Sequence, residues 1–88
     1  MKKCVAIVNL DYNNLSRITS VTFISKHRNF SVVTFNTNSS YNSTTEMIKF
    51  VLVLAKNNDY SIQGYVAFSC AWYDIYFNKR GEYFKYPF

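Results

Sequence analysis

Residues 43–56, with the sequence STTEMIKFVLVLAK, decide the fold because they carry the signals of a helix. Ser43 followed three residues later by Glu46 forms a capping box, in which the hydroxyl and the carboxylate accept hydrogen bonds from backbone N–H groups of the first turn. Asn57-Asn58 is expected to end the helix in a left-handed conformation. An apolar stripe at helical spacing lies between these signals: Met47, Phe50, Val51 and Leu54. The alternative is a buried strand over the apolar run 50–55, but the capping box and the length favour a helix.

A helix with this much apolar surface needs cover, so the remaining chain is predicted to form a sheet. We expect an α+β fold in a single domain (1–88), with a mostly antiparallel sheet of about five strands and one central helix (43–57) packed across it. The first strand is almost continuously apolar, which is typical of a central strand covered on both faces. The expected strands lie near 3–10, 17–26, 30–35, 61–72 and 75–86.

Two further segments shape this prediction. Residues 14–26 are alternatively a second helix, because Leu15, Ile18 and Val21 have helical spacing; the β-branched residues of this segment favour a strand. Residues 36–42 are polar except for Tyr41 and are predicted to be a linker between sheet and helix.

Composition and charge favour binding over chemistry. The 88 residues carry ten Lys and Arg against five Asp and Glu, a net charge of +5, which favours an anionic partner such as nucleic acid or an acidic protein surface. The alternative is a basic surface that only keeps a small protein in solution. Eight Tyr, eight Phe and one Trp supply rings that can stack on unpaired bases.

No arrangement of residues in the sequence predicts an active site or a metal site. His27 has no nucleophile or orienting acid near it in sequence, the five acids form no pair, and Gly64 and Gly81 do not make a phosphate loop. Cys4 and Cys70 lie in apolar runs without metal-ligand spacing and are expected to be buried, reduced thiols. We therefore expect a protein that is not an enzyme and needs no cofactor.

The candidate binding surface combines two groups of cations. If the first three strands form an antiparallel meander, successive strand turns lie at alternate ends of the sheet. The helix then starts at one end and returns the chain to the other, so several cations converge at one end. The terminal hairpin interleaves cations with aromatic rings, and its segment 80–84 superficially resembles the central motif of RNA-recognition domains, from which Glu82 departs. The candidate binding residues are Lys2, Lys3, Lys26, His27, Arg28, Lys56, Lys79, Arg80, Tyr83 and Lys85.

The asparagine-rich segment 36–42 and the terminal hairpin give the chain a composition that resembles small accessory proteins of AT-rich phages. Such proteins act largely as non-enzymatic inhibitors or antitoxins aimed at host enzymes and defence systems. The resemblance implies a phage-encoded, anti-defence inhibitor in the host cytoplasm. It would bind RNA, DNA or a nucleic-acid-handling host or defence protein, without membrane association. The alternative function is a self-associating structural module, a homo-oligomer with no role in nucleic-acid binding.

Overall fold

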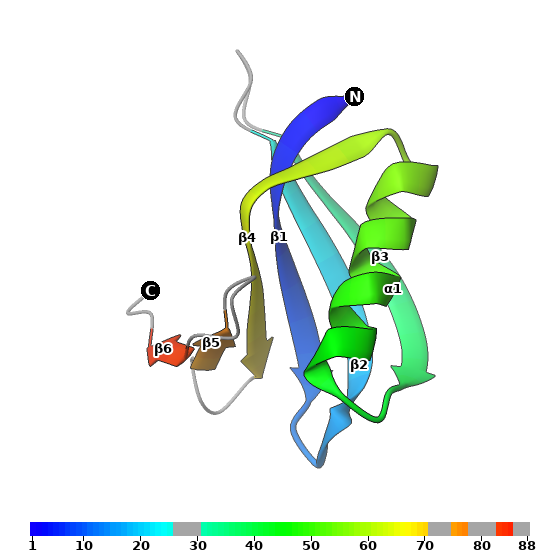
Figure 1. Ribbon diagram of the computed structural model, residues 1–88. Helices are drawn as coiled ribbons and strands as arrows, with labels where there is room; N and C mark the ends of the chain where they lie inside the picture. The colour runs from blue at the N-terminus through cyan, green and yellow to red at the C-terminus, as the bar shows by residue number, and fades with distance from the viewer. Residues whose placement is uncertain (26–30, 71–74, 78–82, 86–88) are drawn as a thin grey trace.

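The computed structural model describes residues 1–25, 31–70, 75–77 and 83–85 and confirms the predicted α+β fold, a mostly antiparallel sheet with one helix packed across it (Figure 1). No helix in these residues is long and apolar enough to cross a membrane. The elements follow in the order β1 (Lys2–Asp11), β2 (Asn14–Ser25), β3 (Ser31–Ser40), α1 (Thr44–Asn57), β4 (Tyr60–Cys70), β5 (Ile75–Phe77) and β6 (Tyr83–Lys85).

The order of strands in the main sheet is β3-β2-β1-β4. The first three strands form the predicted antiparallel meander, and β4 pairs with β1 in parallel. A parallel pair needs a crossover connection, which α1 provides as it returns the chain from the end of β3 to the start of β4. The start of β1, the end of α1 and the start of β4 therefore lie at one end of the sheet (Figure 1). Strands β5 and β6 pair with each other in a separate two-stranded sheet.

The second and third strands differ in extent from the prediction, and the predicted strand 75–86 is wrong because this segment contains two short strands, β5 and β6, that pair with each other. Residues 14–25 form a strand and not a second helix, with Val21 and Phe23 buried on the same face. Strand β3 includes residues 36–40, which the sequence predicted to be linker. The ladder with β2 shifts register between Ile18 and Ser20, so β3 carries an extra residue there. Polar residues are tolerated in this extension because an edge strand has one side open to water.

The capping box forms with one change. The N–H of Glu46 donates to Ser43 Oγ at 3.2 Å, as predicted, while the Glu46 carboxylate accepts from the N–H of Asn42 at 3.2 Å, one residue before the cap. The residue in left-handed conformation that ends the helix was predicted at Asn57-Asn58, and this position is wrong. Asn58 has φ −111°, and the positive φ of 62° falls at Asp59.

The core lies between α1 and one face of the four-stranded sheet. Met47, Val51 and Ala55 are the buried residues of α1, and Phe50 and Leu54 of the predicted stripe are partly buried against the core. The largest fully buried side chains are Phe23, Phe68, Ile18, Val8, Val21, Val51 and Val66. Cys4 and Cys70 are buried and form no disulfide, as predicted.

Strand β1 is central, as predicted, but α1 covers only one of its faces. The residues that alternate with the buried ones, Val5, Ile7 and Asn9, are partly exposed on the opposite face. On that face Asn9 donates through Nδ2 to Ser20 Oγ at 2.9 Å and accepts at Oδ1 from Ser69 Oγ at 3.2 Å. This polar row joins β4, β1 and β2 across the face opposite α1, here called the uncovered face because α1 does not cover it.

Candidate functional site

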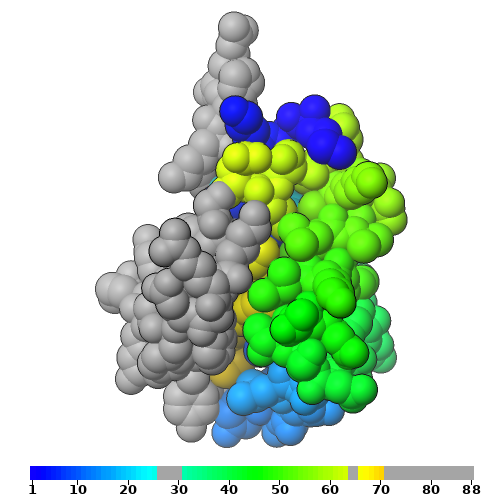
Figure 2. Space-filling view, viewed as in Figure 1, coloured from blue at the N-terminus to red at the C-terminus, as the bar shows by residue number. Residues whose placement is uncertain are grey.

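Three of the ten predicted site residues lie at one end of the sheet, here called the cationic end: Lys2, Lys3 and Lys56. All three side chains are exposed. Lys2 pairs with Tyr60 in the β1–β4 ladder, and its N–H donates to the Asp59 carbonyl at 2.8 Å. Because Asp59 follows the helix C-cap, Asn58, these bonds bring the end of α1, which includes Lys56 in its last turn, to the same end of the sheet as the start of β1. Figure 2 shows the N-terminal residues beside the segment that follows the helix.

The other predicted site residues are not placed. Residues 26–28 and 79–80, which include Lys26, His27, Arg28, Lys79 and Arg80, lie outside the described residues. Tyr83 and Lys85 belong to β6, whose backbone alone is described. The connection that carries residues 26–28 starts after Ser25 and finishes before Ser31. These two serines pair with each other, and Ser25 also pairs with Cys4, so the connection starts and finishes at the cationic end.

An aromatic stack supports the cationic end. The Nζ atom of Lys2 lies 5.9 Å from the centre of the Tyr60 ring, within the range of a cation–π contact. Tyr60 stacks on Phe23, with ring centres 4.9 Å apart and planes at 18°, and Phe23 contacts Phe35 edge-on at 5.7 Å. Because Phe23 is fully buried, the base of the cationic end is fixed to the core.

A shallow hollow opens beside Lys3 on the uncovered face of the sheet. Its volume is about 170 Å³, and its lining combines one ammonium group, one amide and apolar side chains: Lys3, Cys4, Val5, Ile24 and Gln63. A flat apolar surface beside a cation suits a ligand that carries both an anionic group and a ring or an apolar side chain.

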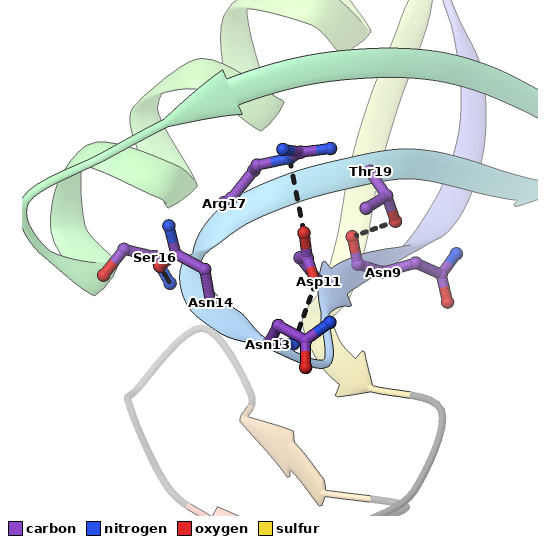
Figure 3. Close-up of polar contacts among 7 residues, drawn as sticks. All are labelled: Asn9, Asp11, Asn13, Asn14, Ser16, Arg17 and Thr19. Atoms are coloured by element: carbon purple, nitrogen blue, oxygen red, sulfur yellow. Dashed lines mark hydrogen bonds and ion pairs between the residues drawn. The ribbon is translucent and has the colours of Figure 1, made fainter.

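The acids in the described part of the chain all have structural partners. Asp11 lies in the β1–β2 turn, where its Oδ2 is 3.5 Å from Arg17 Nε and its Oδ1 accepts from the N–H of Asn13 at 2.8 Å (Figure 3). Glu46 accepts in the capping box, and Asp59 Oδ1 lies 3.9 Å from the Met1 amino group. The pair at Asp59 is exposed on both sides, so it offsets little of the local positive charge.

A second hollow, which sequence reasoning missed, lies at the far end of the sheet from the lysines. It has a volume of about 290 Å³ and lies where the first turn of α1 meets the β1–β2 region, two segments that are in contact in Figure 2. Its lining combines apolar side chains with hydroxyl and amide groups. The described residues that line it are Leu10, Leu15, Ser16, Tyr41, Asn42, Ser43, Thr44, Met47 and Phe68. Among the described residues that line it, none is a histidine, carboxylate or lysine that could act as a general base for these hydroxyls, so this lining suits an apolar group.

The described residues also bear on metal and thiol chemistry. Residues 1–25, 31–70, 75–77 and 83–85 contain no group of three His, Cys, Asp or Glu side chains that could hold a metal ion. Burial raises the pKa of the Cys4 thiol above its ordinary value, which disfavours the nucleophilic thiolate. Cys4 therefore acts as a core residue.

Comparison with known proteins adds no assignment. The chain matches no protein-family model, no curated protein and no solved structure.

Proposed function

We propose that this protein is a small basic, non-enzymatic binding or inhibitor protein whose cationic end holds an anionic partner. The partner is nucleic acid or the acidic surface of a nucleic-acid-handling protein. In keeping with the compositional resemblance, this partner belongs to a phage host or its defence system, and the protein acts in the host cytoplasm. The single observation that carries the proposal is the placement of three exposed lysines, Lys2, Lys3 and Lys56, at the same end of the sheet.

The charge distribution supports this proposal. Two of the three lysines start β1, and the third lies more than fifty residues later, in the last turn of α1. The parallel pairing of β1 with β4 brings them to the same end. Charges that share one end of a sheet raise the positive potential there, so they attract phosphate or carboxylate groups more strongly than scattered charges do.

The positions of the carboxylates and thiols favour a binding function over a catalytic one. In the described part of the chain, the carboxylates of Asp11 and Glu46 hold a turn and a helix start. The thiols of Cys4 and Cys70 are buried in the core. None of these groups is placed as a general base beside an exposed nucleophile, which a catalytic mechanism of acyl or phosphoryl transfer requires.

A matched pair of charge reversals tests the proposal. Lys3 lies at the cationic end and Lys49 on the exposed side of α1, so Lys3→Glu and Lys49→Glu change the net charge equally at different places. We expect Lys3→Glu to weaken binding of a single-stranded oligonucleotide by roughly tenfold and to lower the slope of log K against log salt by about one, as for a lost phosphate contact. We expect Lys49→Glu to change binding little.

Fluorescence anisotropy over a series of salt concentrations gives both quantities. A thermal melt of each variant shows that the fold is retained. Equal weakening by the two variants contradicts a localised site, and binding that does not change with salt contradicts the electrostatic basis of the proposal.

The alternative function, a self-associating structural module, gives a different result in size-exclusion chromatography with absorbance at 260 and 280 nm. Nucleic acid that copurifies with the protein and leaves at high salt supports the anionic-partner proposal. A nucleic-acid-free oligomer that high salt does not change, together with no binding to the oligonucleotide, supports the alternative.

A further inference from the structure

Strand β3 forms one edge of the main sheet and offers backbone groups to a partner. Its one neighbour in the sheet is β2, whereas β4 at the other edge also contacts β5. No described strand pairs with the outer side of β3. An edge of this kind carries N–H and C=O groups that can pair with another extended chain.

Strand β3 has few of the features that normally prevent such pairing. Its sequence, SVVTFNTNSS, contains no charged residue and no proline, and ten residues make it a long edge. Edge strands usually avoid association through lysines, prolines, bulges or short length. The register shift with β2 falls between Asn36 and Ser39, so residues 31–36 remain a regular and uncharged edge.

We propose that two copies of this chain pair through their β3 strands, antiparallel and centred on Thr34, to make one continuous sheet of eight strands. The proposal uses the two four-stranded sheets as they are and needs no change in either copy. It does not depend on the anionic partner, because the lysines of the cationic end are on other elements.

The antiparallel arrangement keeps the cationic ends of the two copies apart. The lysines of the cationic end lie at one end of the sheet, so parallel pairing would place both cationic ends at the same end of the joined sheet. Antiparallel pairing centred on Thr34 places Ser31 of one copy opposite Thr37 of the other, so the two strand starts are about 20 Å apart along the strands, because each residue advances about 3.4 Å. This separation is more than twice the screening length of about 8 Å, so the repulsion between copies is small.

Side-chain chemistry selects Thr34 as the centre. Thr34 Oγ1 lies 3.0 Å from Thr22 Oγ1 on the uncovered face, so a central Thr34 extends a row of threonines from β2 of one copy to β2 of the other. In this register Val33 of one copy lies opposite Phe35 of the second copy, on the face that α1 covers. The two-fold symmetry repeats this pair with the two copies exchanged. Both residues are partly buried apolar side chains that pack against the core. Cross-strand threonine pairs and pairs of an aromatic with a β-branched residue stabilise antiparallel strands.

Sedimentation velocity at physiological salt, on protein from which nucleic acid has been removed by a high-salt wash, tests the pairing with two variants of equal charge. Thr34→Lys places two ammonium groups opposite each other at the centre, whereas Asn13→Lys adds the same charge in the β1–β2 turn; both wild-type side chains are exposed. We expect wild type and Asn13→Lys to be dimers. Like charges directly opposite destabilise a strand pair, so we expect Thr34→Lys to dissociate with a Kd raised roughly tenfold or more.

Cysteine substitution gives a second, positional measurement. Under mild oxidation Thr34→Cys should form a covalent dimer and Asn13→Cys should not, because the native thiols Cys4 and Cys70 are buried. A wild-type protein that stays monomeric, or a Thr34→Lys variant as dimeric as wild type, overturns the proposal. Each result is independent of oligonucleotide binding, so it does not decide the proposed function.

Discussion

Replacing Tyr60 by leucine tests whether the aromatic stack fixes the cationic end to the core. Tyr60 is 7% exposed, stacks on Phe23 at 4.9 Å and has Lys2 Nζ 5.9 Å from its ring centre. Leucine keeps an apolar side chain in place but removes both ring contacts. A stacked aromatic pair contributes about 0.5–1.5 kcal/mol beyond its buried area, and an exposed cation–π contact about 0.5–1 kcal/mol.

The two ring contacts together predict a loss of about 1–2.5 kcal/mol in the free energy of unfolding of Tyr60→Leu. For a chain of this length each kcal/mol shifts the melting temperature by about 4–8 °C, so we expect a decrease of roughly 4–20 °C. Urea denaturation followed by circular dichroism gives the free energy, and a thermal melt gives the Tm. The control Tyr60→Phe retains both ring contacts and should lose only a small part of this stability.

A double-mutant cycle isolates the stacked pair. Phe23→Leu, Tyr60→Leu and the double variant should give a coupling energy of about 0.5–1.5 kcal/mol, because both single variants remove the same contact. A coupling energy of zero within error, or a Tyr60→Phe variant as unstable as Tyr60→Leu, would refute the reasoning.

Two further predictions concern the helix start and the thiols. Ser43→Ala removes the acceptor for the N–H of Glu46 and should lower the free energy of unfolding by about 1 kcal/mol; an unchanged urea midpoint contradicts this role. Burial raises the pKa of Cys4 above the ordinary value of 9.0, so the folded state holds the thiol proton more tightly than the unfolded chain does. The resulting stability is present below pH 9.0 and is lost as the pH rises through the folded pKa, so wild type should lose stability more steeply than Cys4→Ala in alkaline urea titrations.

Local sequence signals predicted the elements that depend on local contacts. The helix follows from Ser43, Glu46 and the apolar stripe, because capping and amphipathic spacing act within a few residues of the chain. The strand over 14–25 follows from its β-branched residues. The end of the helix was misplaced because the positive φ at Asp59 accompanies the bond between its carbonyl and the N–H of Lys2, a contact with a distant part of the chain.

Features that depend on distant contacts were predicted less well. The polar residues 36–40 have little strand preference of their own and are held by pairing with β2, for example Ser40 with Arg17. The cationic end was predicted as far as Lys2, Lys3 and Lys56, because the meander and the helix length decide which end each residue reaches. The hollow near Leu10 and Met47 was not predicted, because it requires the side-chain packing of α1 against the sheet.

The pairing of β1 with β4 has a consequence during synthesis of the chain. The chain order places β1, β2 and β3 before β4, and in this meander β1 and β3 each pair only with β2, so β1 lacks its second neighbour until Tyr60–Cys70 has been made. Synthesis of residues 41–70 takes about 2–6 s at 5–20 residues per second. During that interval the nascent sheet has a second open edge, β1, in which residues 4–8 are all apolar. Chaperones that bind exposed apolar segments therefore have their best target in this protein before the helix and β4 close the sheet.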